Sequence, residues 1–534
     1  MNYFFSIVFM LFTILGNSQG YESLEVHYTD TDQRETILTK RPKQKLYSLF
    51  LDLLEKGYQH ASIDSCLVNQ KNSSLKAFIH LGKQNNQLNT LIFQEGEKQD
   101  TIAAHNLPVL SFYIYDRLKV LENNGYPFAQ IETSTSNYQV IKLRLDKGPF
   151  ITLDSLIELN SPVNSAYIQN YLSIREGEPY SEIKLLSLRR KINNSKFLIM
   201  KSYPSVIFVK DGAKVYLNLE GKKANTFDGI IGIQPSENQR TTITGLVNLS
   251  LVNSLKRGEE IALNWERLLS ESQRLKVSIA APYLFKTKLG LAFQANIIRQ
   301  DSTLNRSLID YRLFYDFSSE SRLSLGLHTA RNNTNISEQS SFQNTSSLAY
   351  DIRYSYRQLD NVLNPRKGGG IFASGLIGER ETLTAENIPL VNFSGQLSYF
   401  LPALKKTTIL FQVKGETLNS DNLFSNELFQ VGGLNFIRGI DQRSLNVSSW
   451  LSSTIEYRFL FDESSNIFIF GESHWNEALT RESYSADQIS ALGIGLSVGT
   501  KSGVFSFNYA LSNQAENTFL FRNAKINFGF SSSF

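Results

Sequence analysis

The second half of this 534-residue chain carries a strand pattern that few folds can accommodate. From about residue 225 onward, apolar and small polar residues alternate in segments of roughly ten residues separated by polar or glycine-rich turns. In the last segment one face holds Ile526, Phe528, Phe530 and Phe534, and the other holds Asn527, Gly529, Ser531 and Ser533. About sixteen such segments within residues 225–534 predict a transmembrane antiparallel β-barrel. A soluble β-sandwich also alternates, but strands this numerous would need two sheets around one dry core.

The N-terminus has one apolar run, residues 4–15, followed by Gly16, Asn17 and Ser18. This order predicts a secretory signal peptide at residues 1–20, although no Lys or Arg precedes the run; a short buried segment is the alternative. The run is too short to span a bilayer as a helix, and no later stretch of about 20 residues is uniformly apolar. Strands therefore remain as the way for this chain to cross a membrane.

Residues 21–222 mix helical and strand periodicity, and the mixture repeats. A helix-period run ends at Gly57 and a second one ends at Gly125, and glycine is a common helix stop. A third unit has the expected elements strand 151–159, helices 164–172 and 181–193, and a hairpin of strands 206–209 and 214–219. These repeats predict three α+β domains, at residues 21–94, 95–148 and 149–222.

The repeats resemble the polypeptide-transport-associated (POTRA) domain, whose order is strand, two helices, then two strands. The resemblance rests on four short segments: Gly57-Tyr58, Gly125-Tyr126-Pro127-Phe128-Ala129, Lys147-Gly148-Pro149 and Arg175-Glu176-Gly177-Glu178-Pro179-Tyr180. It implies that three POTRA-like domains precede the barrel.

A long segment, residues 419–446, separates the eleventh and twelfth expected strands, so we expect it to be the sixth extracellular loop. It contains the motif residues Gly432, Gly433, Ile437, Arg438, Gly439 and Ile440. This motif resembles the sixth-loop signature of the outer-membrane assembly and translocation superfamily that includes BamA, TamA and the two-partner secretion transporters. Residues 253–259 and 360–368 resemble two turns of that family, and the three-domain layout is most similar to TamA.

The resemblance implies that the loop folds back into the lumen and that Arg438 contacts the inner wall. The family usually pairs this arginine with an Asp on strand thirteen, but the matching position here is Phe470. Glu472 lies two residues further and therefore on the same face, so we expect it to supply the carboxylate. An exposed loop arginine is the alternative, but a guanidinium in a partly dry lumen must be paired.

The first and last expected strands, residues 226–234 and 523–534, should meet at a lateral seam. Both contain glycine, Gly229 and Gly232 on one side and Gly529 on the other, and the chain ends at Phe534. Because glycine weakens a strand interior, this seam is predicted to open laterally; an ordinary closed seam is the alternative.

Other chemistry finds little support. The net charge is +4, with 54 basic and 50 acidic residues spread along the chain, so no nucleic-acid partner is indicated. Cys66 is the only cysteine, and the six histidines show no metal-ligand spacing. No nucleophile elbow or phosphate-binding glycine loop is present. We therefore expect no enzyme activity, no metal and no cofactor.

The resemblance implies a protein of the cell outer membrane with its N-terminal domains in the periplasm. The first hypothesis is an insertase whose POTRA domains receive unfolded outer-membrane or secreted polypeptides and whose barrel passes them into the bilayer. A two-partner-secretion-type pore for one dedicated substrate is the second, and a passive porin is the third. Periplasmic or inner-membrane accessory proteins fit the first two.

Overall fold

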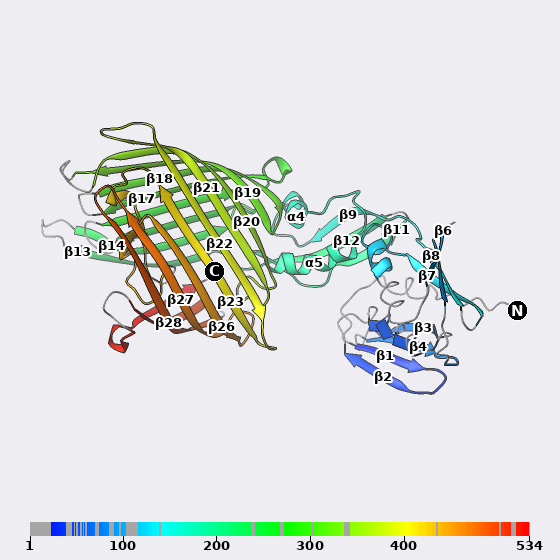
Figure 1. The fold of residues 1–534 in the computed structure, drawn as a ribbon. Coiled ribbons are helices and arrows are strands. Elements are labelled where there is room, and N and C mark those ends of the chain that lie inside the picture. Colours follow the sequence, from blue (N-terminus) through cyan, green and yellow to red (C-terminus); the bar gives the residue numbers. More distant parts are fainter. Residues whose placement is uncertain are drawn as a thin grey trace. The chain divides into compact units, whose positions relative to one another are not determined.

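The computed structural model describes residues 23–38, 45–46, 48–49, 52–53, 56, 58, 61–69, 74–84, 90–95, 98–102, 116–137, 140–210, 212–235, 241–267, 272–300, 304–335, 342–433, 436–500, 503–513 and 519–532. The expected signal peptide, Gly57 and Phe534 lie outside these residues. The chain divides into two compact units, one of residues 1–161, 174–192 and 199–220, and one of residues 162–173, 193–198 and 221–534 (Figure 1).

The first unit contains three small sheets built on one plan. Two of them have four strands in the orders β2-β1-β4-β3 and β6-β5-β8-β7, and the third has β9, β10 and β11 paired with β12. In each sheet the first strand runs parallel to the last one, and the strand before the last pairs with it in antiparallel fashion. The bounds are β1 Ser23–Tyr28, β2 Arg34–Leu38, β3 Ser62–Asn69, β4 Ser74–His80, β5 Thr90–Glu95, β6 Lys98–Ile102, β7 Gln130–Asn137, β8 Val140–Asp146, β9 Thr152–Leu159, β10 Leu198–Met200, β11 Ser205–Val209 and β12 Gly212–Gly221.

These sheets correct one expected boundary. We placed the division between the first two domains at residues 94 and 95, but β5 already begins at Thr90 and pairs with β8 of the second sheet. The boundary was placed too late because it was inferred from the spacing of the repeats, and no helical periodicity directly before β5 marks the start of the second domain. The short strand β10 was also missed, because three residues are too few to show an alternation.

Two helices lie between β9 and β10 along the chain. α4 (Ser165–Leu172) begins after Asn164, whose side chain accepts a hydrogen bond of 2.8 Å from the Tyr167 amide, and it ends at Ser173 in the left-handed conformation. α5 (Glu182–Asn193) buries Leu188 and Ile192 completely. The burial of each such side chain contributes about 1.5–3 kcal/mol. Because the buried side chains recur with the 3.6-residue helical period, the sequence pattern predicted both helices.

The edge of β9 is covered by the segment that carries the Arg175–Tyr180 motif. The Gly177 amide donates to the Leu153 carbonyl at 2.7 Å, and the Leu153 amide donates to the Glu178 carbonyl at 2.8 Å. In the first two sheets the corresponding edges are covered by the extra strands β2 and β6. The motif therefore marks a strand-capping segment of the third domain.

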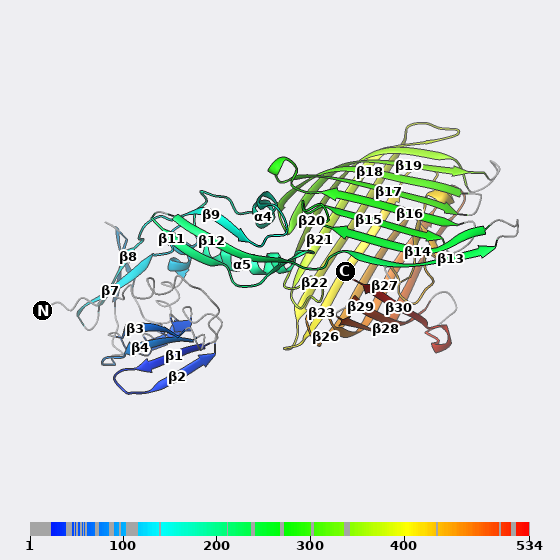
Figure 2. The same ribbon diagram turned by 180° about the vertical axis from the view of Figure 1, so that it is seen from behind.

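The second unit contains a 16-stranded antiparallel sheet, which confirms the expected barrel (Figure 2). Its strands follow the chain order, and the expected sixth loop lies between the eleventh and the twelfth. The bounds are β13 Thr226–Pro235, β14 Thr241–Val252, β15 Glu260–Arg267, β16 Gln273–Ala281, β17 Leu289–Gln300, β18 Leu304–Ser318, β19 Ser321–Thr334, β20 Thr345–Leu359, β21 Gly368–Thr382, β22 Ile388–Pro402, β23 Thr407–Asn419, β26 Ser449–Leu460, β27 Asn466–Leu479, β28 Tyr484–Thr500, β29 Gly503–Ser512 and β30 Lys525–Ser532.

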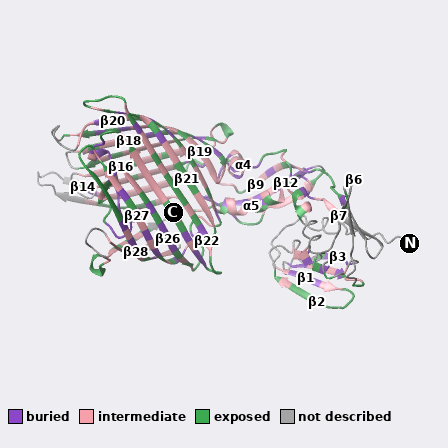
Figure 3. Ribbon diagram, in the orientation of Figure 1, coloured by how far each residue is buried: buried purple, intermediate pink, exposed green. Residues whose placement is uncertain are grey.

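Exposed and covered residues alternate along these strands (Figure 3). Leu325, Ile352 and Phe393 are more than half exposed on the outer face, whereas Asp351 and Glu456 are buried on the inner face. An apolar exterior with a polar interior is the arrangement that a lipid environment requires. No helix among the described residues is long and apolar enough to cross a membrane.

The sheet ends at two strands that do not pair with each other. β13 bonds to β14 and β30 bonds to β29, and among the described residues no backbone pairing joins β13 to β30. Each terminal strand thus keeps one edge of backbone donors and acceptors without a strand partner in this part of the chain.

Candidate functional site

The sixth loop, residues 420–448, folds back on itself through a small hairpin. β24 (Phe429–Val431) pairs with β25 (Leu445–Val447). Beyond this hairpin Gly432 and Gly433 have φ values of 122° and 84°, which L side chains rarely adopt. A Cβ atom on Gly432 would lie 2.5 Å from the Asp441 carbonyl oxygen. The glycine pair is therefore what lets the returning strand of the loop approach so closely.

Arg438 lies at the tip of this loop and is 8% exposed. Its Nε donates to Glu472 Oε1 at 2.5 Å, and its Nη2 donates to Glu456 Oε1 at 2.8 Å. The backbone amide of Arg438 donates to Glu472 Oε2 at 3.1 Å. The guanidinium also lies 3.6 Å from the ring centre of Phe470. The arginine is thus held by charge, by hydrogen bonds and by the face of an aromatic ring.

Further polar groups hold the two carboxylates. Arg458 Nε donates to Glu456 Oε2 at 2.7 Å, and His474 Nε2 lies 3.3 Å from Glu472 Oε2. The two arginines and two glutamates balance in charge. Because a partner removed from a buried pair leaves an uncompensated charge, the cluster fixes the arginine strongly in place.

The structure brings together two residues that the sequence pointed to and three that it did not. Arg438 meets Glu472, and the guanidinium lies over the ring of Phe470, which strand parity places on the same face as Glu472. Sequence reasoning missed Glu456, Arg458 and His474. The first two alternate with outward-facing residues of β26, so their inward orientation could have been read from strand parity. Their proximity to Arg438 could not have been read from strand parity, because it depends on the pairing of β26 with β27.

The aliphatic motif residues pack on the neighbouring wall. Ile437 and Ile440 are 3% exposed and form an apolar cluster with Ile489 of β28. Gly439 lies against β29, where the Ser512 hydroxyl donates to its carbonyl at 2.8 Å. A Cβ atom on Gly439 would lie 3.0 Å from the Ser512 Cβ. Glycine thus permits the loop tip to contact β29, the next-to-last strand of the barrel.

The expected seam residues lie on the terminal strands but are paired with inner neighbours. Gly229 is opposite Val247 and Gly232 is opposite Thr244 in the register of β13 with β14. Gly529 is opposite Ser506 of β29. Among the described residues no backbone pairing joins these glycines across the seam, although β13 and β30 approach each other.

The loop also forms ion pairs with strands near both ends of the sheet, β15 and β30. Arg443 Nη1 lies 3.3 Å from Glu266 Oε2 of β15, whereas Asp441 Oδ1 lies 2.7 Å from Lys525 Nζ of β30. Asp441 and Arg443, which are two residues apart in the loop, therefore link strands near the two ends of the sheet.

The two family-like turns lie at the end of the barrel opposite the sixth loop. In residues 253–259, the Glu259 carboxylate accepts from the backbone amides of Leu255 and Arg257, and a Cβ on Gly258 would overlap the ring of Tyr167 in α4. In residues 360–367, Asn364 Nδ2 donates to the carbonyls of Asp462 and Ser465. Both motifs thus form turns with internal hydrogen bonds, and each turn also contacts another segment: α4 in the first case and the turn at residues 462–465 in the second.

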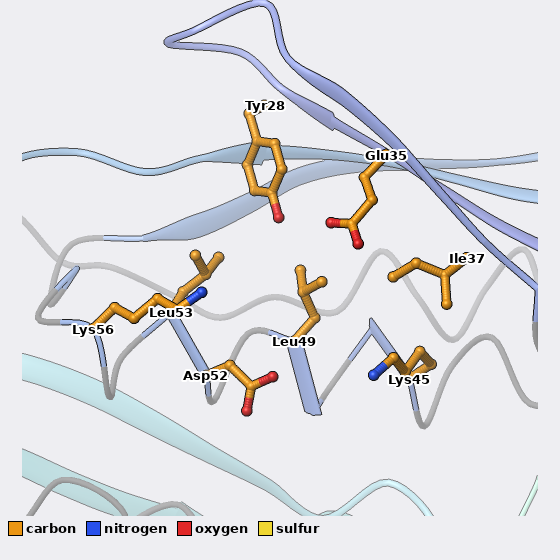
Figure 4. Close-up of a pocket in the computed structure, with 8 residues that line it drawn as sticks. All are labelled: Tyr28, Glu35, Ile37, Lys45, Leu49, Asp52, Leu53 and Lys56. Atoms are coloured by element: carbon orange, nitrogen blue, oxygen red, sulfur yellow. The ribbon is translucent and has the colours of Figure 1, made fainter.

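The first domain offers a separate candidate site, a groove between the edge strand β2 and the helical segment around residues 45–53 (Figure 4). Its volume is about 320 Å³. Figure 4 shows Tyr28 and Glu35 extending from the strands toward Leu49 and Leu53. The groove is lined by Tyr28, Glu35, Ile37, Lys45, Leu49, Asp52, Leu53 and Lys56. A mainly polar lining with charges of both signs and a few aliphatic side chains suits an extended polypeptide beside the strand edge.

Among the described residues, no group of three or more His, Cys, Asp or Glu side chains is arranged to hold a metal ion. Cys66 is buried in the core of the first domain, and this burial raises the pKa of its thiol to about 11. Such a thiol is poorly suited to act as a nucleophile at neutral pH.

Comparisons with known proteins agree with this architecture. The Omp85 superfamily domain matches residues 253–534, which is more than half of the chain. No curated protein sequence matches the chain. The solved structure of CdiB from Escherichia coli is 12% identical, with 92% of this chain and 98% of that chain covered and a TM-score of 0.54. CdiB from Acinetobacter baumannii is 11% identical, with 100% and 94% covered and a TM-score of 0.52.

At these identities the two solved structures show a shared fold, and the domain match carries the family. The chain belongs to the Omp85 superfamily and is an outer-membrane β-barrel protein of its assembly and translocation type.

Proposed function

We propose that this protein inserts client β-strands into the outer membrane through the seam between β13 and β30. The supporting observation is that both terminal strands hydrogen-bond only to their inner neighbours within the described residues. An unpaired strand edge is a template for another strand, and a client that pairs there satisfies its backbone groups before it enters lipid. Gly229, Gly232 and Gly529 weaken the seam strands further.

The N-terminal domains supply the capture step and lie in the periplasm. Edge strand β2 and its neighbouring groove could accept an extended client by adding a strand to the sheet β2-β1-β4-β3. Periplasmic or inner-membrane accessory proteins would bind to the same array. No fuel is required, because clients gain free energy by burying apolar faces in the bilayer.

Arg438 positions the sixth loop during this process. Its contacts with Glu472 and Glu456 hold the loop tip against β26 and β27, while Ile437 and Ile440 pack toward β28. The motif residues Gly432, Gly433 and Gly439 allow the close approaches that this position demands.

Cysteine pairs across the seam test the proposal. Cys66 is first replaced by Ser, and one cysteine is placed in β13 and one in β30. Oxidation should block client insertion into vesicles, and reduction should restore it. The matched control is Asp228→Cys with Asn248→Cys, which are opposite each other in β13 and β14 and should leave insertion intact when oxidised. Full insertion activity of the cross-linked seam variant would rule out lateral opening.

A two-partner-secretion-type pore predicts a different result in cells. Depletion of an insertase lowers the amounts of many outer-membrane barrels, whereas depletion of a dedicated exporter removes one secreted protein. A passive porin would change neither set.

A further inference from the structure

We infer that Arg380 of β21 is a second arginine anchor of the sixth loop, independent of Arg438, and that it keeps the loop inside the lumen when the loop tip leaves Glu472. The inference rests on the proposed function, because it concerns how the loop moves while the seam works. It assigns a positioning role to a residue outside the loop motif.

Arg380 is the largest side chain among the most deeply buried residues and is 1% exposed. Its Nε donates to Glu427 Oε1 at 2.7 Å. Its Nη1 donates to the Asp421 carbonyl at 2.8 Å and to the Ser420 hydroxyl at 3.2 Å, and its Nη2 donates to the Asn422 carbonyl at 2.9 Å. Four acceptors from the first eight residues of the loop therefore converge on one guanidinium.

The acceptors are themselves fixed. Glu427 Oε2 accepts from the Phe424 amide at 2.9 Å, and the Ser420 hydroxyl donates to the Pro389 carbonyl at 2.7 Å. Arg306 of β18 adds a hydrogen bond of 3.3 Å to the Leu428 carbonyl. The start of the loop is thus bonded to β18, β21 and β22, which lie away from the strands that hold the tip.

The two anchors share no residue. Arg438 binds β26 and β27, whereas Arg380 binds residues 420–427. Loss of the tip contacts would leave the four bonds of Arg380 intact, and the loop would remain tethered at its start. A lysine could not replace Arg380, because an ammonium cannot reach carboxylate, hydroxyl and two carbonyls in this planar arrangement.

Ion conductance of the full-length protein in planar bilayers reports whether the loop occupies the lumen. We expect Arg438→Ala and Arg380→Ala each to leave the conductance within about twofold of the parent, because one anchor remains in each variant. The double variant should show an increase several times larger than the sum of the two single effects. Arg380→Lys combined with Arg438→Ala should behave like the double variant.

Arg312→Ala is the matched control, since Arg312 is a lumen arginine that pairs with Asp310 and Asp351 of the wall. It should leave the conductance unchanged alone and when combined with Arg438→Ala. Heat-dependent mobility on gels verifies that each barrel is folded.

A full conductance increase in either single variant would overturn the two-anchor inference, and so would a double variant that conducts like the parent. These outcomes are separate from the proposed function, because the conductance measurement contains no client and the seam cross-link contains no loop substitution.

Discussion

The first domain buries almost only apolar side chains, whereas the barrel buries charged and polar side chains as well as apolar ones. Leu24, Leu75 and Ile79 are fully buried in the first domain, whereas Arg380 and His474 are among the most deeply buried residues of the barrel. Outward-facing barrel residues are apolar and exposed. The same two-residue alternation therefore suits two surroundings: an apolar core with a polar exterior suits water, and an apolar exterior with a polar interior suits lipid.

The strongest test of this contrast separates the two regions. We expect residues 21–221 to form a soluble folded fragment, and residues 225–534 to fold only in detergent or lipid. The reason is that only the second fragment presents an exposed apolar face along most of its strands. Circular dichroism of the separately expressed fragments, with and without detergent, measures the effect. A water-soluble, monomeric fragment 225–534 would contradict the barrel assignment.

The next largest effect concerns a charge buried in the barrel. Arg438→Ala leaves Glu472 without its arginine, while Glu456 keeps its pairing with Arg458, and should lower the free energy of unfolding by about 3–5 kcal/mol. Arg438→Lys should recover only part of this loss, because a lysine cannot bind two carboxylates with a planar fork. Urea unfolding in lipid vesicles provides the measurement.

A double-mutant cycle refines this prediction. Arg438→Glu combined with Glu472→Arg should recover some stability, but less than a simple pair would, because Glu456 then faces a new acidic neighbour. A coupling energy near zero would make Glu472 an ordinary lumen residue. Unchanged client insertion by Arg438→Ala would remove the functional role of the loop tip.

Much of this site could be predicted from the sequence, and the limit has a physical cause. Strand parity places Glu472 on the same face as Phe470, so its inward direction follows from position alone. Glu456 and Arg380 act through neighbours that are 18 and 47 residues away along the chain. Strand parity gives the inward direction of Glu456, but neither contact has a local signal, because each depends on the loop having folded into the lumen.

The same distinction explains the fold. The barrel strands were predicted because each repeats one period over many residues, and the helices α4 and α5 because each has one apolar face. β5 was assigned to the wrong domain because its membership depends on the partner β8, which lies about 50 residues later. Pairing, unlike periodicity, is a property of two segments.

The third prediction concerns the outer face of the barrel. Ile352 of β20 is 52% exposed, and Ile352→Arg should cost about 2–4 kcal/mol if it lies near the bilayer midplane, because a guanidinium then faces hydrocarbon. Ser394→Arg is the control, since Ser394 of β22 faces the other side of the sheet and is opposite the acidic Glu416 in the register. It should cost much less in the same vesicle unfolding assay. Equal losses for the two variants would mean that the outer face does not contact lipid.

The smallest expected effect lies in the first domain, where water screens the charges. Asp30 Oδ2 accepts from the amides of Leu81 and Gly82 at 2.9 and 2.8 Å, and the carboxylate pairs with His80. Burial of the carboxyl opposes its ionisation, but these hydrogen bonds and the charge of His80 outweigh burial and lower the pKa of Asp30 below 3.8.

A lowered folded-state pKa stabilises the domain above the pKa of the unfolded chain, and this stabilisation disappears as the pH falls through the folded value. Asp30→Asn should therefore be slightly less stable than the parent fragment 21–221 at pH 6 to 7, by less than about 1 kcal/mol, as for other exposed pairs. The two proteins should converge as the pH falls below 3.8. Thermal unfolding followed by circular dichroism across this range gives the comparison. A stability difference that persists undiminished well below that pH would show that Asp30 acts through its shape and not through its charge, and the contrast with the enclosed charges of the barrel would then need another cause.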